Sequence, residues 1–358
     1  MRRSRPFGQP ELANRPGRRT NVLLLLICTI GALVCAEVGL RLGATQLATY
    51  SENNGLPYVS HYKADRGRLN VYEPGQDVRL EKPEFVHTRT ANSLGLADRE
   101  VPLAKVPDEY RILALGDSFT EGVGASEDAT WVRVMERDIQ ARYPHRRITT
   151  INAGISGSDP FDAYAILKDR LLPLRADLAI LVLNNSDINE VVVRGGQERF
   201  QPDGALRYRQ GPFWEPVYAL SFLARLVVHA GLGFNYFLIR GGRMPAELET
   251  AGAGILAAVE EIQRLCGEHG MPLLVVVSPI AWEVQQGSYE PEFEEALNLI
   301  AGNPRLGFVD LLKDFGSEGT ITPSTVAGFY WPLDYHHNER GYAVMGGAIA
   351  RHVAGIVR

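Results

Sequence analysis

From Tyr110 onward the chain alternates between short apolar segments and longer amphipathic ones, and this alternation limits the folds that it can adopt. Apolar segments that predict buried strands lie at 112–115, 148–152, 178–183, 273–277 and 307–311. Helical periodicity is found at 130–143, 163–171, 253–269, 291–301 and 339–357. Strands separated by helices predict an α/β fold, a three-layer sandwich with a mostly parallel central sheet. In such sheets, functional side chains collect at the carboxyl ends of the strands.

Composition excludes several classes of protein. The chain has 358 residues with a net charge of −5, so it has no basic field of the kind that nucleic-acid binding requires. Its three cysteines, Cys28, Cys35 and Cys266, have neither the number nor the spacing of a disulfide framework or a zinc site. No metal or organic cofactor is implied, and we expect no nucleic-acid partner.

The N-terminus carries a strong charge asymmetry around an apolar segment. Residues 1–20 contain six arginines and one acidic residue, Glu11. An uninterrupted apolar run of fifteen residues follows at 22–36, and beyond Arg41 the next basic residue is Lys63. By the positive-inside rule, this pattern places the N-terminus in the cytoplasm and the rest of the chain outside.

We therefore predict a single-pass membrane anchor at 21–42, preceded by a basic cytoplasmic tail at 1–20. Fifteen residues are fewer than the roughly 20 that span a bilayer, but Glu37 and Arg41, at i and i+4, could pair at the outer interface and lengthen the helix. A cleaved signal peptide is the alternative, with Val34 and Ala36 as small residues before the cut. On either reading the bulk of the chain is extracytoplasmic, which means periplasmic in a Gram-negative cell.

The rest of the chain divides into a polar, proline-dotted stalk with a few short strands at 43–107 and a catalytic domain at 108–358. Within that domain, residues 190–250 break the alternation and are rich in glycine, arginine and aromatic residues. This insertion could form a lid or acyl-binding wall over a site, or simply a helix packed on the core. Its apolar part, 217–230, is too short to span a bilayer.

The segment 112–124 places a serine where nucleophiles are found in α/β hydrolases. The apolar run breaks at Gly116 and brings Asp117 and Ser118 to a turn at which a helix could begin. Asp and Ser are also common N-cap residues, so the motif taken alone would equally suit an ordinary strand–helix turn.

A second polar segment near the C-terminus supplies the partners that such a serine needs. A serine nucleophile requires a base, and the base requires an acid that fixes its tautomer. Asp334 and His336 are two residues apart, so in an extended loop their side chains point to the same side, whereas His337 points away. This predicts His336 as the base and Asp334 as the acid; a solvated loop or a metal cluster is the alternative.

Together these motifs resemble the SGNH, or GDSL, hydrolases, and in particular their membrane-anchored bacterial members. The first family block corresponds to Gly116-Asp117-Ser118-Phe119, and the second to Asn152-Ala153-Gly154. The last corresponds to Asp334, His336, Asn338 and Gly341, and this register again selects His336. The segment from Asn92 to Glu100 resembles the approach segment of anchored members. The resemblance covers about residues 85–358 and implies a Ser118–His336–Asp334 triad.

The third block departs from the family pattern Gly-x-Asn-Asp, whose Asn donates a hydrogen bond to the oxyanion. Here the segment is Asn184-Asn185-Ser186-Asp187, which puts Ser186 in the donor's position. Asn185 could take over if the loop shifts by one residue. The expected oxyanion hole therefore consists of the backbone N–H groups of Ser118 and Gly154 with Ser186 or Asn185. Losing one such donor costs about 10²–10³ in kcat in known enzymes.

The resemblance implies a serine esterase, or acyl-ester hydrolase, that acts on an acylated envelope or exported substrate, with carbohydrates among the candidates. An O-acyltransferase that passes the acyl group to an exported polysaccharide is the second hypothesis, because water and an alcohol compete for the same acyl-serine. A catalytically silent envelope-binding protein is the third, supported only by the altered third block.

Overall fold

The computed structural model describes residues 18–44, 64–65, 71–202, 206–207, 212–234, 238–316 and 326–357. By their internal contacts these residues form two compact units. One combines residues 1–60 with 211–241, and the other combines 61–210 with 242–358. The predicted strands and most of the predicted helices fall in the second unit.

A five-stranded parallel sheet forms the centre of the second unit, in the order β5-β4-β6-β8-β9. The strands are β4 (Glu109–Gly116), β5 (Arg147–Gly154), β6 (Leu178–Leu183), β8 (Leu273–Val277) and β9 (Gly307–Asp310). Strands β4, β6 and β8 are buried along their whole length. The continuous apolar sequences of β6 and β8 predict this, whereas β4 also buries the ion pair of Glu109 and Arg111. After β5 the chain crosses to the other side of β4, so the strand order reverses between β4 and β6. Ligands bind at such a switch point in open α/β sheets.

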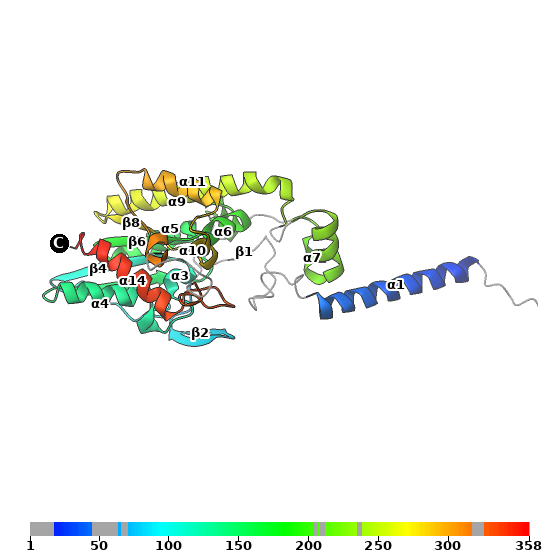
Figure 1. Ribbon diagram of the computed structural model, residues 1–358, viewed down its shortest axis with the longest axis horizontal. Helices are drawn as coiled ribbons and strands as arrows, with labels where there is room; N and C mark the ends of the chain where they lie inside the picture. The colour runs from blue at the N-terminus through cyan, green and yellow to red at the C-terminus, as the bar shows by residue number, and fades with distance from the viewer. Residues whose placement is uncertain are drawn as a thin grey trace, which may run out of the picture. The chain divides into compact units, whose positions relative to one another are not determined.

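Helices cover both faces of this sheet, which confirms the predicted three-layer α/β fold. On one face lie α4 (Trp131–Arg142) and α14 (Glu339–Val353); on the other lie α5 (Pro160–Ile166), α6 (Ser186–Arg194), α9 (Met244–Glu268) and α11 (Pro291–Ala301), as Figure 1 shows. Helix α9 begins nine residues earlier than predicted, inside the segment interpreted as an insertion. Short helices α10 (Ala281–Gln286) and α12 (Leu312–Gly316) follow β8 and β9.

The hydrophobic core between the sheet and the α4/α14 layer is dense. Trp131, Met135, Tyr342 and Met345 are fully buried there against Ile112, Ile180 and other strand residues. The helix caps are those that the sequence supplies: Thr130 accepts from the backbone of Arg133 to begin α4, and the Asn338 side chain accepts from the Gly341 N–H to begin α14.

Two antiparallel pairs precede or flank the sheet. Strands β2 (Asp77–Lys82) and β3 (Phe85–Thr90) form a hairpin with a two-residue turn, Pro83-Glu84. Strands β1 (Ala64–Asp65) and β7 (Leu206–Arg207) form a second short pair. Of the predicted stalk at 43–107, residues 45–63 and 66–70 lie outside the described residues.

The first unit contains α1 (Arg18–Gly43), α7 (Glu215–Leu220) and α8 (Phe222–Leu226), which continues as a π-helical turn to Gly231. Helix α1 is 26 residues long, and its apolar part has a mean hydropathy of 2.5, so it is long and apolar enough to cross a membrane. Glu37 and Arg41 form the predicted ion pair at 2.7 Å.

Candidate active site

Strand β4 delivers Ser118 to the carboxyl edge of the sheet. The strand ends at Gly116, which has a φ of +152°. Thr120 leaves no room for a side chain there, because a Cβ on residue 116 would lie 2.3 Å from Thr120 Oγ1. Asp117 then caps the four-residue helix α3 (Ser118–Glu121) by accepting a hydrogen bond from the Phe119 N–H at 2.9 Å. Ser118 is the first residue of this helix and is only partly buried.

A continuous hydrogen-bonded chain joins Ser118, His336 and Asp334. His336 Nε2 lies 2.7 Å from Ser118 Oγ, and His336 Nδ1 lies 2.5 Å from Asp334 Oδ1. An ionised carboxylate only accepts hydrogen bonds, so Nδ1 carries the hydrogen and the Nε2 lone pair faces the serine. The arrangement can remove the hydroxyl proton of Ser118.

The surroundings of Asp334 keep it ionised. Its side chain is only 6% exposed, and burial by itself would raise the pKa of the carboxyl. The hydrogen bond to His336, together with the positive charge of Lys82, outweighs burial and holds the pKa of Asp334 below its ordinary value.

The loop that brings Asp334 and His336 together is a turn, not the extended segment that we expected. Residues 332–334 form the turn, and Tyr335 has a φ of +69°, in the left-handed region. The Tyr335 N–H donates to the Trp331 carbonyl, and the Trp331 N–H donates to the His336 carbonyl, each at 2.9 Å. The side chains of Asp334 and His336 therefore meet because the backbone reverses at this turn. They do not meet because alternate residues of an extended segment point to the same side, as we expected.

His337 lies in the hydrophobic core, away from the serine. It is fully buried, its ring stacks on Phe315 at 4.9 Å, and its Nε2 lies 3.1 Å from Ser278 Oγ. Burial lowers the pKa of His337 to about 3, so it is neutral at ordinary pH. Gly341 is required here, since a Cβ would lie 2.2 Å from the Phe329 carbonyl oxygen and 2.9 Å from His337 Nδ1.

The β2–β3 hairpin supports the turn that carries Asp334. The Glu84 carboxylate accepts the backbone N–H groups of Leu333 and Asp334, the latter at 2.9 Å. Lys82 Nζ lies 3.7 Å from Asp334 Oδ2, and Phe85 packs against Trp331 with ring centroids 5.5 Å apart. The sequence gives no sign that Lys82 and Glu84 contact this loop, because no local pattern links a hairpin turn to a loop about 250 residues later.

The third-block residues form a buried polar cluster behind Ser118. The Asn184 side-chain amide donates to Asp117 Oδ2 at 2.8 Å. Ser186 Oγ lies 2.6 Å from Asn184 Oδ1 and 3.2 Å from Asp117 Oδ2, so its hydroxyl hydrogen is directed at these acceptors. The neighbouring Asn185 is partly exposed, and among the described residues its side-chain amide has no hydrogen-bond partner.

Burial raises the pKa of Asp117, and burial followed by repulsion from Asp117 raises the pKa of Asp187 well above its ordinary value. The Asp187 carboxylate also accepts the Asn184 N–H at 2.8 Å. This cluster fixes the segment after β6 against the segment after β4.

The backbone N–H of Gly154 is not directed toward the serine. It donates to the Asn152 side-chain oxygen at 3.0 Å, and the residue packs so closely on α3 that a Cβ would lie 2.1 Å from the Glu121 nitrogen. The geometry therefore does not support Gly154 as an oxyanion donor. In the loop that follows, Gly157 has a φ of +72°, and within the described chain its N–H has no acceptor.

That loop is held at the sheet edge by residues on both sides. Ser158 Oγ donates to the Gly116 carbonyl at 3.0 Å, and the Ser156 N–H and hydroxyl both donate to the Glu121 carboxylate at 2.6 Å. Gly157 lies between these two anchored residues.

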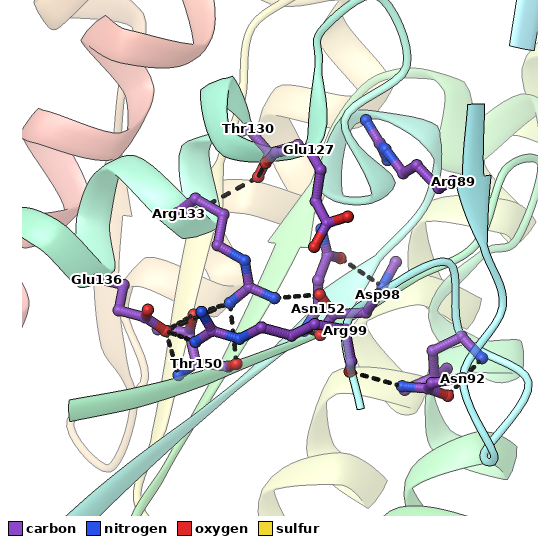
Figure 2. A network of polar contacts seen from close by, with 12 residues as sticks. Arg89, Asn92, Asp98, Arg99, Glu127, Thr130, Arg133, Glu136, Thr150 and Asn152 are labelled. Atoms are coloured by element: carbon purple, nitrogen blue, oxygen red, sulfur yellow. Dashed lines mark hydrogen bonds and ion pairs between the residues drawn. The ribbon is translucent and has the colours of Figure 1, made fainter. Parts of the chain in front are cut away.

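The segment from Asn92 to Glu100 fixes β5 from behind, as Figure 2 shows. Asp98 pairs with Arg133 of α4 and accepts the Asn152 N–H at 2.9 Å. Arg89 donates to the carbonyls of Glu121, Gly122 and Ala125, which closes the loop after α3. These contacts give the approach segment a structural role beneath the site.

Comparison with protein families matches residues 114–344 to the GDSL-like lipase/acylhydrolase family. The chain belongs to this family. It is therefore a serine hydrolase of the kind that acts on esters. Comparison with curated protein sequences gave no match.

Several solved structures resemble this GDSL-like chain. One is a lipolytic protein of the G-D-S-L family from Desulfitobacterium hafniense DCB-2, with 14% identity over 67% of this chain and 98% of that chain, at a TM-score of 0.42. Another is a two-domain esterase active on acetylated mannans, with 15% identity over 69% and 50% of the two chains, at a TM-score of 0.40. A third is an acetyl xylan esterase, with 16% identity over 68% and 99%, at a TM-score of 0.41.

Proposed function

We propose that this chain is a membrane-anchored serine esterase in which Ser118 is the nucleophile, His336 the general base and Asp334 the residue that orients it. The observation that carries the proposal is the continuous chain of hydrogen bonds from Ser118 Oγ through His336 to Asp334, at 2.7 and 2.5 Å. The seclusion of His337 in the core supports His336 over its neighbour.

The reaction follows from these positions. Ser118 Oγ bonds to the ester carbonyl carbon as His336 Nε2 takes the hydroxyl proton, and the carbonyl oxygen becomes an oxyanion. The carbon–alkoxy bond then breaks, and the leaving alcohol receives the proton from His336. A water molecule, deprotonated by His336 in turn, then bonds to the acyl carbon. The bond between that carbon and Ser118 Oγ breaks, His336 returns the proton to Oγ, and the acid is released.

For the oxyanion hole we propose the backbone N–H groups of Ser118 and Gly157 with the side-chain amide of Asn185. Ser118 lies at the N-terminus of α3, where N–H groups lack intrahelical acceptors. Gly157 and Asn185 are proposed because their donors are unoccupied, whereas those of Gly154 and Ser186 are engaged elsewhere. The proposed substrate-binding face is thus the switch point between β4 and β6.

We also propose that α1 is a signal anchor and that the catalytic domain faces out of the cytoplasm. The support is the excess of arginine before α1 and the apolar length of that helix. An anchored, outward-facing esterase meets acyl esters of the envelope or of exported molecules first, so we propose that class of substrate, with acylated carbohydrates among its members.

The test is to incubate the full chain, purified in detergent, with acetylated oligosaccharides and chromogenic acyl esters, with and without an unacylated saccharide acceptor. Release of free acid that is lost in Ser118→Ala is the expected result. Transfer of the acyl group to the acceptor in preference to water would overturn hydrolysis in favour of O-acyl transfer. Failure to turn over any ester would overturn the proposed catalysis.

A further inference from the structure

The helical segment α7–α8 is fastened to the C-terminal part of α1. The Glu37 carboxylate accepts hydrogen bonds from Ser221 Oγ at 2.8 Å and from the backbone N–H groups of Phe222 and Leu223 at 3.0 Å. Arg41, which pairs with Glu37, also donates to the Leu220 carbonyl. A carboxylate at a helix N-terminus is a favourable arrangement, and it joins the start of α8 to α1 (Figure 1).

This attachment fixes the depth of α8 relative to α1. Glu37 lies six residues before the end of the helix at Gly43, which at 1.5 Å per residue is about 9 Å from that end. The polar layer on each side of a bilayer is roughly 5–8 Å thick. If α1 spans the membrane as proposed above, with Gly43 at the outer surface of the bilayer, the first turn of α8 lies within or just below the outer polar layer.

Several apolar side chains of the α7–α8 segment are exposed. Val217 and Leu220 lie three residues apart on α7 and so share one helical face, and Phe213 lies in the turn before that helix; the three side chains are 60%, 75% and 95% exposed. Leu226 and Val227 are exposed as well. A cluster of exposed apolar side chains of this size marks a surface that is covered in use.

Charged and aromatic groups lie underneath this surface. Arg225 is fully buried, with its guanidinium 4.4 Å over the Phe222 ring and its Nε donating to the Tyr218 carbonyl. Trp214 packs edge-on against Phe234 at 5.2 Å. Tyr218 and Val228 are buried in the same small core, so the exposed apolar side chains named above lie outside a core that the segment already has. Trp and Tyr are enriched at membrane interfaces.

We propose that the face formed by Phe213, Val217, Leu220, Leu226 and Val227 is a lipid-contact surface that lies in the outer interface of the membrane beside α1. This proposal rests on the proposed anchor. Lipid is the occupant because Glu37 fastens this segment to a helix whose own apolar side chains are exposed along its length. Interfacial helices bury such a face about 5–10 Å into the headgroup boundary.

The test is to measure the membrane depth of single nitroxide labels in the full chain, reconstituted into lipid vesicles. Labels are placed at Val217→Cys and Leu220→Cys in a background in which Cys28 and Cys35 are replaced by alanine. Cys266 stays unlabelled because it is buried and burial raises its thiol pKa to about 12. Collisions with oxygen, which concentrates in lipid, are compared with collisions with a water-soluble nickel chelate.

Two controls make the result decisive. Leu299→Cys replaces an exposed leucine, 56% accessible, on α11 of the catalytic unit and should report water. In a separate variant that keeps Cys28 and replaces Cys35 by alanine, a label on Cys28 in α1 should report lipid. We expect an oxygen-to-nickel collision ratio at residues 217 and 220 that is severalfold higher than at residue 299.

Each other outcome overturns a defined part of the proposal. Water exposure at 217 and 220 with lipid at Cys28 would refute the lipid contact and leave the anchor intact. Protection from both reagents would mean that protein, such as a second copy of this chain, covers the face. Water at Cys28 would overturn the anchor itself. Finally, Glu37→Ala should lower the ratio at 220 but not at Cys28, and an unchanged ratio would show that Glu37 does not set the depth.

Discussion

The Glu84 carboxylate accepts the backbone N–H of Asp334 at 2.9 Å, and so joins the turn of the β2–β3 hairpin to the residue that orients His336. The same carboxylate holds the Leu333 N–H. It thereby supplies two acceptors to a turn whose next residue, Tyr335, has a left-handed conformation. We interpret Glu84 as a positioning residue that acts on the site only through Asp334.

If so, Glu84→Gln should lower kcat about tenfold with little change in KM, because hydrogen bonds to a charged acceptor are worth about 1.5–3 kcal/mol and only part of this is lost with a neutral amide. Steady-state kinetics on a soluble ester would measure the effect. Glu81→Gln is the matched control, since Glu81 lies on the same hairpin and its side chain pairs with the exposed Arg79. Equal losses in both variants would indicate a general effect on the hairpin.

Ser118 should be the residue that reacts with a fluorophosphonate probe. Mass spectrometry of the labelled full chain should find one modified serine, and Ser118→Ala should abolish labelling while leaving the fold intact, since it removes one partly exposed hydroxyl. Ser186→Ala is the control and should still be labelled. Persistent labelling of Ser118→Ala would refute the assignment.

The two adjacent histidines should behave differently. His336→Ala should lower kcat by at least about 10³, as the loss of a triad member does in other enzymes. His337→Asn should mainly lower stability, because His337 packs in the core against Phe315 and contacts Ser278 rather than Ser118. A larger loss of kcat for His337→Asn in the folded fraction would mean that the base has been misassigned.

The proposed oxyanion donor can be tested in the same way. Asn185→Ala should lower kcat by about 10²–10³ with KM little changed, because its amide would act on the charge that develops in the transition state. Ser186→Ala is the natural comparison, since the Ser186 hydroxyl is engaged by Asn184 and Asp117. If Ser186→Ala is the more damaging to kcat, the hydroxyl turns toward the substrate during the reaction.

Stability should depend on pH through His337. Its pKa is lowered from 6.5 to about 3 by burial, so between these values the unfolded chain binds a proton that the folded chain does not. The contribution of the buried, neutral His337 to the free energy of unfolding is therefore complete above pH 6.5. It is lost as pH falls, by about 1.4 kcal/mol per pH unit between the two pKa values. Chemical unfolding of the full chain in detergent at pH 7 and pH 5 should show a larger loss for the wild type than for His337→Asn. Equal losses would show that His337 is not the group responsible.

The sequence by itself determined the parts of this protein that depend on short-range pattern. Period and apolarity over five to ten residues predicted the strands of the central sheet, and β6 and β8 have the predicted bounds. Local spacing likewise predicted that Ser118 follows a buried strand. The i, i+4 pairing of Glu37 with Arg41 is of the same kind. Asp334 does contact His336, but through a turn rather than the extended segment from which that contact was predicted.

Tertiary structure alone decided which groups surround these residues. Glu84 contacts a loop 250 positions away, so this contact leaves no periodic signal in the sequence. The left-handed Tyr335 is stabilised by contacts from the Trp331 backbone and the hairpin, which override its local preference for extended backbone. Likewise, only the folded chain shows that Glu37 caps α8 as well as pairing with Arg41, because that contact joins segments 185 residues apart. Propensity and spacing act within a few residues, whereas hydrogen bonds between distant segments exist only once the chain has packed.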